Sequence, residues 1–436
     1  MLEQKRNLLK YINEPIIGDI YGLISTINSG MTSEEIVIIL SNILNIVEKK
    51  QYNEKEAFEP NSIHVILGLI NESNNEEIIL HSLYIISDFF LPNWPKKDSF
   101  FENHDILKQI FIPHIMNNDK NIVPLFGIAT GISSLSENAR NTVFEYFIWD
   151  INVYDSSKSD IEVLMGSYYL VGMSKYPLEN SISINIIAKL SDIIPSINDS
   201  SALYNVLYSV YQILSNNEGS IEFLFNETNL LEQMSQMIQK KNPYLSKIVL
   251  GILGKLVDVN TEALSYFRVS DITFYLQSGV KSDDSIECLS LACYIVSIGL
   301  ESFPFIFSKR LIDDSILKEL RGILKGANYR TRLYGCQLGK AIIQYSVKSL
   351  QYAFVVMHFT EDYFSLLYSD EPEYVKTGIE TLEIIAHFAS NWGILDVFIN
   401  DIEDMNYLFS FTVHSEEAIS ISANVIYNLV NGSEPE

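Results

Sequence analysis

Basic residues are scarce in this sequence of 436 amino acids. Its 30 lysines and arginines stand against 55 aspartates and glutamates, which gives a net charge of −25. Sequence-independent binding to DNA or RNA needs clustered Lys and Arg, so this balance argues against nucleic-acid partners. It also argues against docking on anionic membrane surfaces. The acidity favours solubility, and it leaves basic proteins as the class of partner that is attracted electrostatically.

Cysteine and long apolar runs are also rare. The three cysteines, Cys288, Cys293 and Cys336, form no C-x-x-C pair. An odd, scattered set of thiols is typical of buried cysteines in a reducing compartment, so we expect a cytoplasmic protein. No run of about 18 apolar residues occurs, and we therefore expect no membrane insertion. The first residues lack the apolar core of a signal peptide.

Motifs that carry chemistry are missing as well. The seven histidines are scattered, without H-E-x-x-H or paired Cys/His spacing, so no metal site is predicted. No P-loop, dinucleotide, hydrolase or kinase signature is present. The segment Gly251–Lys255 resembles a phosphate loop in composition only, because it falls inside a predicted core helix. We therefore expect no catalytic residues, no cofactor and no enzymatic activity.

The sequence is rich in one helical pattern. Residues Asn74–Pro92 begin with polar and acidic residues, continue with apolar residues at helical spacing, and end at a proline. Ser82, a small residue in the middle of this bulky helix, indicates close approach to a neighbouring helix. Helices with a small residue at the same place recur at steps of 40 to 46 residues, at Ser41, Ser82, Gly127, Ser167, Ser209, Gly251, Ala292, Gly335, Thr381 and Ala423.

A helical pattern with a period of about 42 residues predicts a solenoid of the armadillo or HEAT type. A short and a medium helix are expected before most of the long helices, and three helices per unit is the armadillo plan. The predicted fold is an all-α, right-handed α-solenoid. We expect a single domain over residues 1–436, with about nine or ten repeats between residues 30 and 432 and a short acidic tail at residues 433–436.

These repeats resemble armadillo-repeat proteins, and their local spacing is most similar to that of importin-α. In that family the third helix of a repeat carries a small residue, then Trp two positions later, then Asn four positions after the Trp. Tyrosine takes the Trp position in several repeats here, and polar residues take the Asn position in two of them. The candidate peptide-binding residues are Tyr84, Asp88, Tyr169, Tyr211, Ser215 and Tyr294.

The resemblance implies a non-enzymatic, importin-α-like adaptor that recognises an extended basic peptide or protein segment along its concave groove. It also implies a nuclear-transport receptor as a further partner and the nucleus as a second location. In the family, Trp faces stack on Lys or Arg stems, and Asn side chains hold the peptide backbone. None of the three tryptophans stands in this column, no repeat has the Asn, and a long basic importin-β-binding segment is absent. We therefore expect a weaker or differently directed groove.

Two alternatives remain open. Tyrosine at helical spacing is also typical of core packing, in which case the tyrosine column binds nothing. The chain would then be a general armadillo scaffold for a protein complex, β-catenin-like or HEAT-like, with folded partners and no nuclear-import role. An enzymatic function would require scattered polar residues to converge in a deep pocket.

Overall fold

The computed structural model describes residues 20–49, 61–90, 105–106, 110–111, 122–146, 160–277, 283–326 and 328–432. Every regular element in these ranges is helical, and no strand occurs in them. By its internal contacts the chain divides into two compact units, Met1–Ser220 and Ile221–Glu436. The single domain of about nine or ten repeats stays a prediction, and the predicted tail at residues 433–436 lies outside the described residues.

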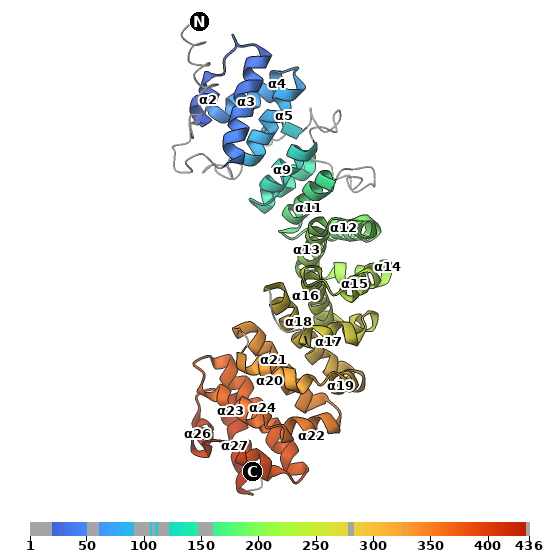
Figure 1. Cartoon of the computed structure of the whole chain (residues 1–436), viewed down its shortest axis with the longest axis vertical. Helices are drawn as coiled ribbons and strands as arrows, with labels where there is room; N and C mark the ends of the chain where they lie inside the picture. The colour runs from blue at the N-terminus through green and yellow to red at the C-terminus, as the bar shows by residue number, and fades with distance from the viewer. Residues whose placement is uncertain are drawn as a thin grey trace. The chain divides into compact units, whose positions relative to one another are not determined.

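The described part of the first unit consists of helices. Long helices follow one another in contact, with α3 against α5, α9 against α11, and α11 against α13. The elements are α2 (Ile20–Thr26), α3 (Ser33–Glu48), α4 (Ser62–Glu72), α5 (Glu76–Ile85), the π-helical segment η1 (Ile86–Phe90), α9 (Ile122–Ser133), α10 (Glu137–Tyr146), α11 (Asp160–Ser174), α12 (Asn180–Ile193), η4 (Ile194–Ser196) and α13 (Ser200–Asn216), with α14 (Gly219–Glu227) at the boundary (Figure 1).

The second unit has the predicted armadillo plan, because two or three short elements precede each of the long helices α18, α21, α24 and α27. Each long helix packs against the next, from α16 through α18, α21 and α24 to α27 (Figure 1). The elements are α15 (Leu230–Gln239), α16 (Pro243–Val259), η5 (Thr261–Tyr266), α17 (Val269–Gln277), α18 (Asp283–Ser302), α19 (Pro304–Asp313), α20 (Ile316–Gly326), α21 (Tyr329–Tyr345), α22 (Lys348–Val356), α23 (Phe359–Phe364), η6 (Ser365–Tyr368), α24 (Pro372–Asn391), α25 (Leu395–Asn400), α26 (Met405–Ser410), η7 (Phe411–Val413) and α27 (Glu417–Asn431).

Polar caps explain where the long helices begin. Asn75 accepts hydrogen bonds from the first backbone N–H groups of α5, and Asn242 does the same for α16, whose first residue is a proline. Such caps satisfy N–H groups that have no partner within the helix, and proline suits the first helical position. The stretch predicted as one helix after Asn74 changes from α-helix to π-helix at Ile86. This π segment packs against α9, with Ser87 next to Gly127.

The small-residue column lies mostly in the core, as predicted. Ser82, Ser167, Ser209, Ala292, Gly335, Thr381 and Ala423 are buried, whereas Gly127 and Gly251 are half-buried. The prediction is wrong for Ser41, which is exposed because α3 turns Ile39, Leu40 and Ile43 into the core instead. Gly127 illustrates the close approach, since a Cβ atom there would lie closer than 3.0 Å to Oγ of Ser87 and would force that side chain to move.

Helix α18 is long and apolar enough to cross a membrane by length and composition alone. Half of its most apolar window is buried in the protein, where the helix packs between α16 and α21. A helix at the centre of a folded core passes the same test, so the contacts favour a core helix. Cys288 and Cys293 lie on its buried side, and like Cys336 they are free thiols, as the sequence predicted.

Candidate functional site

Helix α13 carries three stacked, half-buried tyrosines on one face. Tyr204, Tyr208 and Tyr211 are four and three residues apart, a spacing that places side chains on one face of a helix. The ring centroids of Tyr204 and Tyr208 are 6.3 Å apart with an interplanar angle of 6°. Those of Tyr208 and Tyr211 are 6.2 Å apart at 20°. The half-buried rings therefore form one continuous aromatic surface along the helix.

Two side-chain hydrogen bonds hold α13 against α11. The amide of Asn205 donates to the hydroxyl of Ser167 at 3.0 Å, and the hydroxyl of Ser174 donates to the amide oxygen of Gln212 at 2.7 Å. Ser167 belongs to the small-residue column, and its burial lets α13 approach closely. The two bonds lie about two turns apart along the helices, so they set the orientation of the α13 tyrosine face relative to α11.

The prediction of Tyr169 as a peptide-binding residue is wrong, because its side chain is 0% exposed. The ring lies in the core with its centroid 5.7 Å from that of Phe126 on α9. Burial also raises the pKa of its phenol well above the ordinary value. The adjacent Tyr168 is 45% exposed and lies on the open face of α11. The sequence contained this signal in the pair of neighbouring tyrosines, but the spacing from Ser167 selected the buried member.

Tyr84 and Asp88 lie together at the junction of α5 and η1. Tyr84 is half-buried and Asp88 is exposed. Burial raises the pKa of the Tyr84 phenol, and the nearby charge of Asp88 raises it further. Although Asp88 is exposed to solvent, the protein around its carboxylate desolvates it and raises its pKa, against a lowering contribution from the Ser87 hydroxyl. An aromatic ring beside a carboxylate can contact a cationic side chain through both groups, so this pair stays a candidate for binding.

Tyr211 and Ser215 are one turn apart at the end of α13. Ser215 is exposed, and its hydroxyl donates to the backbone carbonyl of Tyr211 at 2.8 Å. This back-bond uses the only proton of the hydroxyl within the helix, so Ser215 can offer a peptide only its lone pairs. Tyr211 is therefore the stronger candidate of the two.

Tyr294 is half-buried on α18 in the second unit. Its hydroxyl donates a hydrogen bond to Asp258 of α16, and its ring centroid is 5.3 Å from that of Tyr334 on α21. Partial burial, followed by the hydrogen bond to Asp258, raises the pKa of the Tyr294 phenol well above its usual range. The guanidinium of Arg330 lies 5.7 Å from the Tyr334 ring. Tyr294 therefore connects three consecutive long helices.

Polar bridges between neighbouring long helices continue across the second unit. Lys247 of α16 pairs with Asp284 of α18 at 2.7 Å, and Lys340 of α21 pairs with Glu380 of α24 at 2.6 Å. Tyr329 of α21 donates to Glu373 of α24 at 3.0 Å. Sequence reasoning missed these pairs, although their members are 37 to 44 residues apart, close to one repeat. These polar groups of the long helices therefore already have partners within the protein.

The predicted site residues thus fall into separate groups. Tyr84 and Asp88 are neighbours, Tyr211 and Ser215 are neighbours, and Tyr294 belongs to the second unit, whereas Tyr169 is buried. The structure adds Tyr168, Tyr204 and Tyr208 to the exposed or half-buried tyrosines of the first unit. The segment Gly251–Lys255 lies within α16, as predicted, and forms no phosphate loop.

No protein-family model matches the chain, and no curated protein matches it. Among solved structures, the crystal structure of an engineered protein from the Northeast Structural Genomics Consortium is similar over 95% of this chain and 99% of that chain, with 14% identity and a TM-score of 0.67. A designed armadillo repeat protein is 15% identical, with a TM-score of 0.48, over 56% of this chain and 100% of that chain. A designed armadillo repeat protein in complex with the peptide (KR)4 is 14% identical, with a TM-score of 0.45, over 56% of this chain and 98% of that chain.

The likeness to the engineered protein spans nearly the whole of both chains and shows the fold alone. Together with the three-helix repeats of the second unit, it confirms the predicted fold class, an all-α solenoid of armadillo-like repeats. The function has to be argued from the surfaces of this chain.

Proposed function

We propose that this chain is a non-enzymatic protein-binding scaffold that takes an extended basic segment of a partner across the tyrosine-bearing faces of α11 and α13. The observation that carries the proposal is the stack of Tyr204, Tyr208 and Tyr211 on one helix face. Tyr168 adds a fourth, exposed aromatic ring on the adjacent helix α11.

The physical basis is attraction between cationic side chains and aromatic faces in an acidic protein. Each exposed cation–π contact contributes about 0.5–1 kcal/mol, so several contacts are needed for useful affinity. The net charge of −25 adds a long-range attraction for Lys- and Arg-rich segments, which salt weakens. The scaffold should therefore bind basic peptides with modest affinity that falls as the ionic strength rises.

The finer assignment is an importin-α-like adaptor. Its partners would be a basic protein segment and a nuclear-transport receptor, and its location would be the cytoplasm, with the nucleus as the second site. The pairing of Tyr84 with Asp88 at the expected spacing supports a family-like groove. Three free, buried thiols are typical of a protein in a reducing compartment.

A general scaffold for folded partners is the second candidate, and exposed apolar side chains on α19 favour it. Phe305 is 71% exposed, and Ile306 and Ile312 are exposed on the same short helix. Ile312 also lines an open apolar pocket together with Leu350 and Met357. Exposed apolar clusters of this kind are typical of contact surfaces for folded proteins.

A fluorescence-anisotropy titration tests the first proposal. A labelled peptide of alternating Lys and Arg is titrated with the wild type and with Tyr208→Ala/Tyr211→Ala, each at about 50 mM and about 300 mM salt. Loss of two cation–π contacts should weaken binding by about 5- to 30-fold at low salt. Tyr352→Ala is the matched control, because it removes an exposed tyrosine from α22, a short helix of the second unit.

Two results would count against the basic-peptide proposal: no binding of the peptide by the wild type, or equal losses for the control and the double variant. Either result would favour the general scaffold. That candidate predicts instead that Phe305→Asp reduces binding of folded partners while both tyrosine variants keep it.

A further inference from the structure

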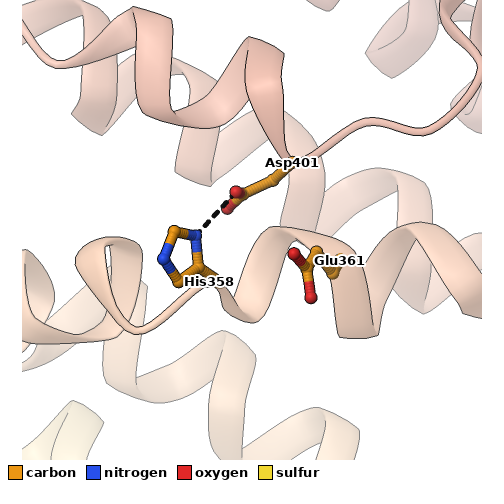
Figure 2. Close-up of side chains that lie close together, drawn as sticks. All are labelled: His358, Glu361 and Asp401. Atoms are coloured by element: carbon orange, nitrogen blue, oxygen red, sulfur yellow. Dashed lines mark hydrogen bonds and ion pairs between the residues drawn. The ribbon is translucent and has the colours of Figure 1, made fainter.

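A histidine and an aspartate, one repeat apart, meet in the second unit. His358 lies in the junction between α22 and α23, and Asp401 follows the last residue of α25. Figure 2 shows their side chains directed toward each other, with the Nδ1 atom of His358 2.7 Å from Oδ1 of Asp401. Glu361, in the first turn of α23, places a third donor beside them.

The Asp401 carboxylate is buried and only partly satisfied. The residue is 7% exposed, and its Oδ2 atom has no hydrogen-bond partner in the described residues. A buried carboxylate oxygen without a partner is costly, because the charge has lost its water without gaining a compensating group. This oxygen without a hydrogen-bond partner therefore indicates that a cationic group binds next to Asp401.

Two other buried carboxylates of the same unit show one way in which such burial is balanced. Asp362 receives Arg321 at 2.7 Å on one oxygen and Lys325 at 3.2 Å on the other. Asp314 receives Arg310 at 2.6 Å and the hydroxyl of Thr273 at 2.9 Å. Both have a permanent cation, whereas the ionic partner of Asp401 is a histidine.

The three donors are close enough to share one ion. One ligand atom from each of His358, Glu361 and Asp401 lies within 4.8 Å of the others. Zinc binds nitrogen and oxygen ligands at about 2 Å, so its ligand atoms must come within about 4 Å of one another. His358 and Glu361 are exposed and can rotate by the small amount that remains.

The net charge of the side chains around His358, Glu361 and Asp401 favours binding of a divalent cation. Arg321 donates to the carbonyl of His358 at 2.9 Å and lies 3.5 Å from Glu361, but its closest carboxylate is Asp362. Of the three carboxylates Glu361, Asp362 and Asp401, the first two pair with the fixed cations Arg321 and Lys325. The ion pair of Asp401 in the described residues is with His358. The balance is negative before any metal binds.

We propose that His358, Glu361 and Asp401 form a binding site for one divalent transition-metal ion of the zinc type, which joins two consecutive repeats. One imidazole and two carboxylates suit zinc, cobalt or manganese, whereas calcium and magnesium prefer oxygen ligands alone. Glu361 and Asp401 also line an open pocket with Tyr368 and Glu403. Solvent, or a side chain of a bound partner, can therefore reach the fourth coordination position.

The test is titration of the metal-stripped full chain with zinc chloride by calorimetry, and with cobalt chloride by visible absorption. The wild type should bind one zinc ion per chain and unfold at a higher temperature with zinc than with a chelator. Asp401→Asn and His358→Lys should each weaken zinc binding by about tenfold or more, because each removes a ligand. Circular dichroism checks that both variants remain folded.

His387→Ala is the matched control, since His387 is an exposed histidine of the same unit on α24. It should bind zinc like the wild type. The proposal is overturned if the wild type shows no saturable zinc binding, or if His358→Lys and His387→Ala bind zinc equally well. If the wild type binds no zinc and the His358→Lys variant is equally stable, His358 serves only as a cationic partner of Asp401.

Discussion

Gly172 of α11 lies directly against the backbone of Thr130 on α9. A Cβ atom at position 172 would be 2.9 Å from the carbonyl oxygen of Thr130 and 3.4 Å from its Cα atom. Backbone atoms cannot rotate aside as a flexible side chain can, so a larger residue must push the two helices apart. Close helix approach in the first unit therefore depends on this glycine.

Replacing Gly172 by alanine should lower the free energy of unfolding by about 1–3 kcal/mol, because overpacking outweighs the gain in helix propensity. Gly68→Ala in α4 is the control, since a Cβ there meets no atom within 4 Å. It should leave stability unchanged or raise it by up to about 1 kcal/mol. Urea unfolding followed by circular dichroism measures both, and equal stability of the two variants would contradict the close contact.

Arg321 of α20 should stabilise the second unit through the buried carboxylate of Asp362. Arg321→Met leaves that carboxylate, whose side chain is 3% exposed, with only the more distant Lys325. Breaking a buried ion pair costs about 3–5 kcal/mol, and the remaining lysine should reduce the loss to about 2 kcal/mol. Lys376→Met removes a solvent-exposed pair with Glu416 and should cost less than about 1 kcal/mol. Similar urea midpoints for the two variants would argue against this role for Arg321.

Much of the fold could be predicted from the sequence because local signals repeat. Caps such as Asn75 and Asn242 and small residues such as Ser82 and Ser209 recur at the repeat distance, and each has a local physical cause. The exposure of Ser41 could not be read in this way, because it depends on which face of α3 packs against α5.

The site was harder to predict, because neighbouring residues on a helix point about 100° apart. Tyr168 and Tyr169 are adjacent residues of the same type, so the sequence does not distinguish them. The packing of Tyr169 on Phe126 determines that Tyr169 is the buried one. His358 and Asp401 form no short motif, since 43 residues separate them. Their proximity could be read only by comparing positions one repeat apart, and the sequence analysis predicted no metal site.

The different environments of Tyr168 and Tyr169 predict opposite effects of truncation. Tyr169→Ala should lower the free energy of unfolding by about 3–5 kcal/mol, because it leaves a cavity beside Phe126. Tyr168→Ala should change it by about 0.5 kcal/mol or less, since the residue is exposed. In the peptide titration, Tyr168→Ala should weaken binding. A stable Tyr169→Ala variant that has lost peptide binding would restore the original prediction for Tyr169.

The buried thiols should be almost inert in the folded protein. Burial raises the pKa of Cys288 and of Cys336 from about 9 to about 12, and Cys293 is raised further. At pH 8 the thiolate fraction then falls by about a thousandfold, and thiolate is the reactive form. A thiol reagent such as DTNB should therefore modify all three cysteines only after denaturation, whereas an added Ser215→Cys should react at once. Burial favours the neutral thiol, so the folded state gains free energy of unfolding from these groups below their ordinary pKa of about 9. That contribution decreases as the pH rises from about 9 toward 12. Labelling of the native wild type as fast as Ser215→Cys would contradict the packing of α18 and α21.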